Sequence, residues 1–334
     1  MSVFQGTILG PTLFSCFIND LPNATDLLSI LYADDTTGLD SDSDLQTLIT
    51  RVSSELSKMA NWFQANKMSL NLSKTKYIIF HTQGKKIDQN LTLQIDENPP
   101  GAPHDPSRVT TIERIHYKHP DHKSQAFKLL GIYLDEHLNF NYNTTHLSNK
   151  LSKAIFFINR VKNFLTPRAL KSLYLSFFHS HLLYCPTIYS CTSTKNLNSI
   201  FKKQKKAIRI ISGAQYLDHT TPLFETLRIL PLEKIITHSK SSFMHSIYYN
   251  YAPASFSNTW ITLAQHHPDI QLRNSHNFYL PPPRIELFKK LPLYSLPSTW
   301  NSLGDLRFQH NRYTFRSASL NLLLPTPPPL PHLG

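Results

Sequence analysis

Residues 27–39 read Leu27-Leu28-Ser29-Ile30-Leu31-Tyr32-Ala33-Asp34-Asp35-Thr36-Thr37-Gly38-Leu39. An apolar run is followed by two adjacent acids and a short return, which predicts a buried strand and a hairpin with carboxylates at its tip. Two carboxylates in so small a volume repel each other unless cations neutralise them. Mg²⁺ prefers carboxylate oxygens and leaves positions open for phosphates, so the pattern favours phosphoryl or nucleotidyl transfer with two ions about 3.5–4 Å apart. The alternative is an ordinary Asp-rich turn.

Length and composition allow two domains, because the chain has 334 residues of which 40% are hydrophobic. The first residues lack the charged and apolar regions of a signal peptide, and no window approaches the ~20 apolar residues of a membrane span. We therefore expect a soluble, intracellular protein of the nucleus or cytoplasm that makes no membrane contact. Three cysteines cannot build a disulfide framework, so we expect reduced packing residues at Cys16, Cys185 and Cys191.

The positive charge is concentrated in one part of the chain. The net charge is +12, and no Asp or Glu occurs between His137 and Leu217. Twelve basic residues lie in that segment, namely Lys150, Lys153, Arg160, Lys162, Arg168, Lys171, Lys195, Lys202, Lys203, Lys205, Lys206 and Arg209. A solvated helix face usually mixes both signs, so this segment indicates a polyanionic partner, of which nucleic acid is the simplest.

Apolar residues at helical spacing predict helices at 12–20, 43–65, 144–164, from 166 onward, and 195–212. The second begins with a capping-box pattern of Ser43 and Gln46, and the fourth with Thr166 as cap before Pro167. The fourth is expected to pack through Leu170, Leu173, Tyr174 and Phe177. In the fifth, a basic stripe at i, i+3, i+4 and i+7 is formed by Lys202, Lys205, Lys206 and Arg209. Phosphate contact is the functional interpretation of the stripe, and generic solubility is the alternative.

Strands are predicted at 76–80, 91–95, 109–116 and 127–134. Because residues 84–125 are rich in polar residues, His and Pro, we expect a surface excursion there. The chain ends in a Pro-rich segment that predicts a flexible tail. Three histidine groups lack a supporting acid or cysteine pattern, and surface or packing roles are expected for His266 with His267, His179 with His181, and His116 with His119 and His122.

Four motifs occur in order along the chain: Phe4-Gln5-Gly6-Thr7-Ile8-Leu9-Gly10-Pro11-Thr12-Leu13-Phe14, Tyr32-Ala33-Asp34-Asp35, Asn71-Leu72-Ser73-Lys74-Thr75-Lys76 and Leu129-Leu130-Gly131-Ile132. In this combination the chain resembles the reverse transcriptase of non-LTR (LINE-type) retrotransposons. The similarity extends through the basic helical region to Thr299-Trp300-Asn301-Ser302-Leu303, so that it covers essentially the whole chain.

The resemblance implies a role for each motif. Asp34 and Asp35 would be the catalytic metal ligands for Mg²⁺, and Tyr32 would lie beneath the primer end. Lys74 would serve as a proton donor to pyrophosphate. Template and nucleotide would contact Gln5 and Gly6, where glycine permits close approach. The primer grip would comprise Leu129, Leu130 and Gly131.

The resemblance also implies an α+β fold: a partial polymerase palm with an antiparallel sheet and helices over 1–135, then an α-helical thumb over 136–215, then an irregular C-terminal region over 216–334. The expected partners are an RNA template, a DNA primer or RNA–DNA duplex, and nucleoside triphosphates. The nucleic-acid backbone would contact the basic stripe.

Family members carry a third metal-binding Asp on a palm strand that precedes the Gln-Gly motif, and this chain begins four residues before Gln5. We therefore expect an N-terminally truncated fragment of an RNA-directed DNA polymerase that is inactive alone. One alternative is a non-catalytic nucleic-acid-binding remnant. Another is the product of a decayed element without a stable fold, since missing palm strands would expose a sheet edge.

Overall fold

The computed structural model describes residues 6–88, 90–98, 101, 103–117, 119, 125–256, 258–270 and 273–324. Gln5 and the Pro-rich end of the chain lie outside these residues. The chain divides into two compact units: residues 1–128 with 135–138, and residues 129–134 with 139–334. Helices and small sheets both occur, as expected of an α+β fold.

The first unit contains a long helix and several short strands. Its elements are α1 (Gly10–Ile18), a 3₁₀ turn (Leu21–Ala24), β1 (Leu28–Tyr32), β2 (Asp35–Leu39), α2 (Leu45–Ala65), β3 (Lys76–Ile78), β4 (Gln94–Asp96), a 3₁₀ turn (Pro106–Arg108), β5 (Val109–Thr111) and β6 (Glu113–Ile115). β7 (Phe127–Leu129) and β8 (Ile132–Leu134) form a two-stranded sheet where the chain passes into the second unit.

Helix α2 lies where the helix over 43–65 was predicted, but its N-cap is Asp44 and not the predicted Ser43. The carboxylate of Asp44, rather than Ser43, accepts the capping hydrogen bond, from the backbone N–H of Thr47 at 2.7 Å. The Ser43 hydroxyl does not cap the helix and instead donates a hydrogen bond to the Asp42 carboxylate at 3.4 Å. The apolar face of α2 buries Met59 and Phe63 against Ile18, Leu21 and Leu27, which precede and begin the acidic hairpin.

A buried carboxylate on α2 anchors the chain where it enters β1. Glu55 accepts hydrogen bonds from the Thr25 hydroxyl at 3.0 Å and from the backbone N–H of Asp26 at 2.8 Å. Its other oxygen accepts from Lys58 at 2.6 Å. These hydrogen bonds, that of Lys58 first, lower the pKa of Glu55 and keep it ionised. The start of β1 is thereby fixed to the helix that underlies it.

The segment 84–125 differs from the expected surface excursion. Strand β4 pairs antiparallel with β5, and β6 pairs parallel with β3. Leu93, Ile95, Ile112 and Ile115 are each exposed by 3% or less, and β4 lies against α2. In short strands, buried apolar residues alternate with exposed polar ones. The polar composition of the segment therefore gave no indication that its apolar residues belong to the core.

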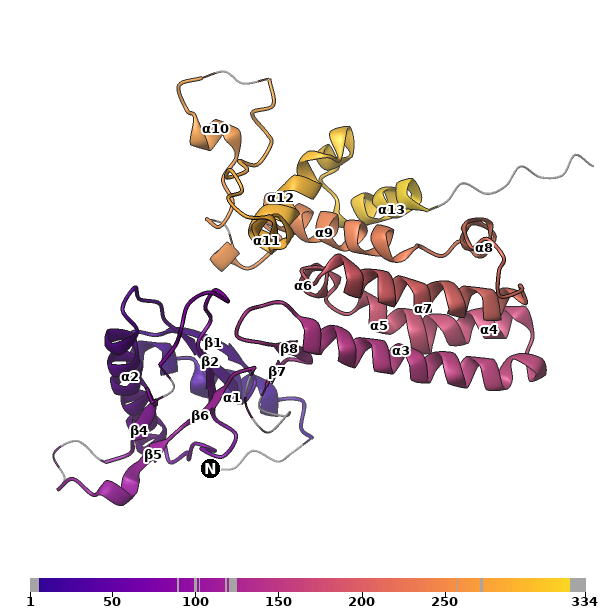
Figure 1. Cartoon of the computed structure of the whole chain (residues 1–334). Helices are drawn as coiled ribbons and strands as arrows, with labels where there is room; N and C mark the ends of the chain where they lie inside the picture. Colours follow the sequence, from indigo (N-terminus) through magenta and orange to yellow (C-terminus); the bar gives the residue numbers. More distant parts are fainter. Residues whose placement is uncertain are drawn as a thin grey trace, which may run out of the picture. The chain divides into compact units, whose positions relative to one another are not determined.

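The second unit is almost wholly helical. It comprises α3 (Asn141–Val161), a 3₁₀ turn (Lys162–Phe164), α4 (Pro167–Leu173), a π-helical segment (Tyr174–His179), α5 (Ser180–Leu183), α6 (Pro186–Tyr189), α7 (Thr194–Ser212), α8 (Thr221–Leu227), α9 (Leu232–Tyr248), a 3₁₀ turn (Ala254–Phe256), α10 (Leu263–His266), α11 (Glu286–Lys290), α12 (Pro292–Asn301), a 3₁₀ turn (Gly304–Phe308) and α13 (Arg312–Leu323). Helices α3 and α7 run side by side (Figure 1). Leu151, Ile158, Ile200 and Ile208 are fully buried between the helices of this core.

The π-helical segment changes which aromatic residue is buried. Thr166 caps α4 as predicted, by accepting from the backbone N–H of Ala169 at 3.3 Å. The wider π turn then rotates the later residues, so that Phe178 is buried and Phe177 is 49% exposed. The prediction that Phe177 packs inward was therefore wrong.

The region after residue 216, expected to be irregular, is largely helical and has its own core. Trp300 and Phe315 are fully buried there, together with Met244 and Phe278. Helix α9 joins this core to the preceding one, because Leu232 and Ile235 at its start pack into the α3–α7 core. These helices were not predicted because the region is rich in proline, which usually interrupts helices. In α12, however, Pro292 is the first helical residue and Pro297 lies inside the helix.

None of the described helices is both long enough and apolar enough to cross a membrane.

Candidate functional site

The two adjacent acids lie at the tip of an antiparallel hairpin, as predicted. Tyr32 of β1 is opposite Asp35 of β2, which leaves Ala33 and Asp34 as a two-residue loop. Ala33 has φ +50°, a left-handed conformation that costs a residue with a side chain about 1–2 kcal/mol. A tight hairpin with strain at its tip is therefore built around the two carboxylates.

Asp34 and Asp35 are both exposed and offer hard oxygen donors. Such donors fit a hydrated divalent cation such as Mg²⁺, which needs only one or two carboxylates from the protein. Within the residues that the structure describes, no third His, Cys, Asp or Glu joins them in a metal-sized group. The hairpin therefore presents a two-carboxylate site that is open to solvent.

Strand β1, which leads into these acids, is less buried than predicted. Leu28, Ile30 and Tyr32 lie on one face of β1 and are 67%, 52% and 63% exposed. Their neighbours Leu27 and Leu31 face the core formed with α2. A two-stranded sheet packed on one side leaves its other face in solvent, which explains the alternation.

Gly6 and Lys74 lie on exposed segments of the first unit. Gly6 has φ +90°, and a Cβ atom built on it meets nothing within 4 Å. The turn at Lys74 is closed by Asn71, whose side chain accepts from the Lys74 backbone N–H at 3.3 Å. In the described part of the chain, no hydrogen bond or ion pair joins Lys74 to Asp34 or Asp35.

The residues expected to form a primer grip lie at a second hairpin tip. Leu130 and Gly131 connect β7 to β8, and both have positive φ, +46° and +86°. Two central residues with positive φ are typical of a type I′ hairpin turn. The Tyr184 hydroxyl donates a hydrogen bond to the Leu130 carbonyl oxygen, and a Cβ on Gly131 would lie 3.2 Å from that hydroxyl oxygen.

The basic stripe on α7 is only partly free. Lys202 and Lys206 are exposed. Lys205 lies over the Phe201 ring at 4.5 Å from its centroid, and the Arg209 Nε donates to the carbonyl oxygen of Asp218 at 2.9 Å. Lys202 and Lys206 are therefore the stripe residues with the greatest freedom to meet a ligand.

The charge of the wider basic segment is not neutralised locally. Eight of its twelve basic side chains are exposed: Lys150, Lys153, Arg160, Lys162, Arg168, Lys195, Lys202 and Lys206. Every ion pair found among the described residues involves other cations. Unpaired positive charge of this density attracts polyanions.

Sequence analysis missed two polar centres. One is Gln204, fully buried on α7, whose amide donates to the Leu230 carbonyl at 2.9 Å and accepts from the Leu232 N–H at 2.8 Å. The other joins His81 to Glu136 and His137. A lone Gln between inward-facing Ile200 and Ile208 was the available signal for the first. Of the cysteines, Cys191 is buried and Cys16 is exposed, which corrects the expectation that all three pack.

Comparison with known proteins gives three matches at 25–28% identity. Over 257 residues, 73% of this chain, it is 25% identical to the RNA-directed DNA polymerase from mobile element jockey of Drosophila melanogaster. It is 28% identical over 251 residues to the probable RNA-directed DNA polymerase from transposon BS of the same species, and 26% identical over 236 residues to the jockey polymerase of Drosophila funebris. These homologues are RNA-directed DNA polymerases of non-LTR mobile elements.

The resemblance stated from the sequence is thereby confirmed over 67–73% of the chain, rather than over essentially all of it. The matches cover 25%, 25% and 23% of the three polymerases, so the chain spans about a quarter of the length of these relatives. No protein-family model and no solved structure matches the chain.

Proposed function

We propose that the chain is a segment of an RNA-directed DNA polymerase. The observation that carries this proposal is the pair Asp34 and Asp35 at a strained, exposed hairpin tip in a chain whose homologues are named RNA-directed DNA polymerases. Residues 1–135 would form part of the palm, and residues 136–215 would form the thumb. An RNA template, a DNA primer and nucleoside triphosphates are the corresponding partners.

In this proposal the two carboxylates hold the divalent metal ion, Mg²⁺ in the first instance. When bound, the metal neutralises charge on the phosphates during attack of the primer 3′-hydroxyl. Tyr32, adjacent on the same tip, positions the primer end. Gln5 and Gly6 contact the template and nucleotide, Lys74 donates a proton to the departing pyrophosphate, and Leu129, Leu130 and Gly131 support the primer.

We further propose that the chain does not polymerise by itself. A two-metal site usually needs more carboxylate ligands than the two at this hairpin tip, and the described residues bring no third ligand to it. The exposed apolar face of β1, with Leu28 and Ile30 in solvent, is also typical of a sheet face that another protein segment covers.

Primer extension tests this assignment. The purified chain is given an RNA template, an annealed DNA primer, nucleoside triphosphates and Mg²⁺. No incorporation is expected. Template-directed extension that is lost in Asp34→Asn but kept in Asp26→Asn, a control at an exposed acid, would show that the chain is a polymerase without further ligands.

A non-catalytic nucleic-acid-binding role is the second candidate. The observation in its favour is the basic segment between residues 137 and 217, where eight exposed cations have no ion-pair partner among the described residues. Lys202 and Lys206 would contact phosphates of an RNA–DNA duplex. Binding without extension supports this role, and absence of both contradicts it.

A further inference from the structure

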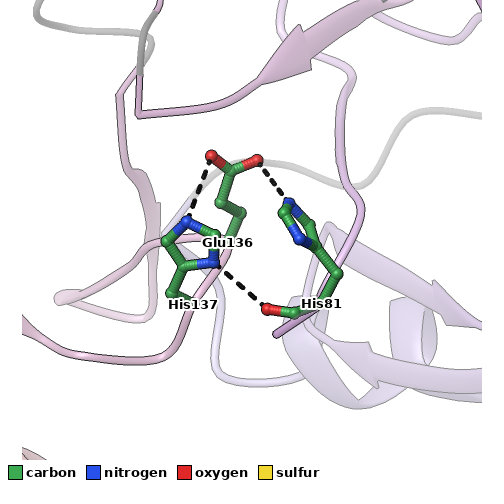
Figure 2. A group of neighbouring side chains, drawn as sticks. All are labelled: His81, Glu136 and His137. Atoms are coloured by element: carbon green, nitrogen blue, oxygen red, sulfur yellow. Dashed lines mark hydrogen bonds and ion pairs between the residues drawn. The ribbon is translucent and has the colours of Figure 1, made fainter. Parts of the chain in front are cut away.

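Three metal-ligating side chains converge in the first unit, away from the residues used above. His81 follows β3, and Glu136 and His137 follow β8, so the two segments are 55 residues apart in sequence. Their side chains are exposed by 9%, 2% and 9%. One ligand atom from each residue lies within 4.8 Å of the others (Figure 2).

Both imidazole rings are held by backbone carbonyl groups. The His81 Nδ1 lies 2.9 Å from the carbonyl oxygen of Thr82, and the His137 Nδ1 lies 3.1 Å from that of His81. A carbonyl oxygen can only accept a hydrogen bond, so each Nδ1 carries the proton and donates. In the neutral ring the remaining nitrogen, Nε2, is then a lone-pair donor to a metal.

Both Nε2 atoms face the same carboxylate. His81 Nε2 is 3.3 Å from one oxygen of Glu136, and His137 Nε2 is 3.8 Å from the other. A carboxylate oxygen also only accepts, so neutral imidazoles would place lone pairs against lone pairs in a buried site. Either a proton on Nε2 or a metal ion between these atoms removes that conflict, and only the metal ion uses all three side chains as ligands. Zinc bonds of about 2.0–2.1 Å in tetrahedral geometry separate the ligand atoms by roughly 3.4 Å. The Nε2 atoms lie 3.3 and 3.8 Å from the two carboxylate oxygens, and the three ligand atoms lie within 4.8 Å of one another.

The guanidinium group of Arg114, on β6, lies beside Glu136 and has buried nitrogen atoms without hydrogen-bond partners among the described residues. Its Nη2 lies 3.6 Å from Glu136, while its Nε and Nη1 are buried without a hydrogen-bond partner among the described residues. Unsatisfied buried donors on a charged group are costly. An oxygen ligand in the fourth position of a metal ion would accept from this guanidinium.

We propose that His81, Glu136 and His137 bind a divalent transition-metal ion, Zn²⁺ in the first instance. Two imidazoles and a carboxylate with hydrogen-bonded Nδ1 atoms form a typical zinc ligand set. The ion would link the segment after β3 to residues 135–138, which follow the β7–β8 hairpin and belong to the first unit. Its role would be to hold residues 135–138 in that unit. The site is independent of the polymerase assignment, because none of its residues is used there.

Zinc content tests the proposal. The full chain, expressed without a polyhistidine tag, is stripped with a chelator, supplied with Zn²⁺ and titrated against a chromogenic chelator. One Zn²⁺ per chain is expected, with affinity weakened more than about 100-fold in Glu136→Gln and His137→Gln, since loss of a second-shell partner alone costs about 10- to 100-fold. The double variant His266→Gln/His267→Gln, which removes an exposed histidine pair, keeps full affinity.

Two measurements on the unaltered chain guard against misfolded variants. Co²⁺ should give the visible absorption bands of a tetrahedral N/O site, and Zn²⁺ should raise the melting temperature in a concentration-dependent manner. An unaltered chain that binds less than one Zn²⁺, or shows neither cobalt bands nor a thermal shift, would overturn the proposal. So would equal zinc affinity in the unaltered chain and in a folded Glu136→Gln variant.

Discussion

The hydroxyl group of Tyr184 donates a hydrogen bond to the carbonyl oxygen of Leu130 and so closes the turn at which β7 reverses into β8. The same hydroxyl limits the space beside Gly131. A side chain that follows α5 in sequence thus contacts the hairpin tip to which the resemblance assigns the primer grip.

Gly131→Ala should destabilise the chain by about 1–3 kcal/mol. The new methyl group would require positive φ in a residue with a Cβ and would crowd the Tyr184 hydroxyl. Tyr184→Phe, which removes the hydrogen bond but keeps the ring, should cost about 0.5–1.5 kcal/mol. Urea denaturation measures both. A neutral Gly131→Ala variant would contradict this geometry.

Ala33→Gly should stabilise the acidic hairpin by up to about 1 kcal/mol, because glycine adopts the φ of +50° at this position without strain. Urea denaturation, followed through Trp62 fluorescence in the first unit, reports the change. Ala60→Gly, inside helix α2 of the same unit, is the matched control and should lower stability by about 1 kcal/mol or more. A loss of stability in Ala33→Gly would mean that the tip is not strained.

Gln204→Leu should cost about 2–5 kcal/mol, although leucine is hydrophobic and similar in size. The substitution leaves the Leu230 carbonyl and the Leu232 N–H without partners in a buried site. Lys202→Leu, two residues earlier and exposed, should change stability by no more than about 0.5 kcal/mol. Equal effects of the two substitutions would show that the amide network is dispensable.

Acidification should destabilise the second unit through His179. Burial lowers the pKa of this imidazole to about 4, from an ordinary value of about 6.5. Between those two pH values the unfolded chain binds a proton that the folded chain does not, so stability falls as pH falls through this window. The His179 contribution should be about 2 kcal/mol between pH 7 and pH 5.

Urea denaturation of His179→Gln at the two pH values isolates that contribution. The variant should lose less stability on acidification than the unaltered chain, while His104→Gln, at a 62% exposed site, should not differ from it. Identical pH dependence in all three proteins would show that His179 is protonated equally in the folded and unfolded states.

Local patterns predicted most of the helices and the acidic hairpin. The Thr166–Pro167 start of α4 and the apolar faces of α2, α3 and α7 were visible because each depends on residues close in sequence. The π turn at Tyr174–His179 was not, since an i→i+5 bond leaves no distinctive composition. Phe177 was misplaced for that reason.

Long-range features were beyond local patterns. Strands were predicted at 91–95 and 109–116, but their burial was not: Ile95 in β4 and Ile112 between β5 and β6 are buried through strand pairing and contact with α2. His81 and Glu136 come together only because the chain returns to the first unit at 135–138. The one local hint was Asp135-Glu136-His137, three polar residues directly after an apolar strand.

Titration of a fluorescent RNA–DNA duplex at increasing salt tests most directly the claim on which both candidate functions rest, that the basic segment of this chain binds nucleic acid. Binding should weaken linearly on a log–log scale of affinity against salt. The double variant Lys202→Gln/Lys206→Gln should reduce the slope by roughly 1.4–1.8, because each phosphate contact contributes about 0.7–0.9. Lys85→Gln/Lys86→Gln, outside the basic segment, should leave the slope unchanged. Absence of binding, or binding that does not respond to salt, would contradict the account.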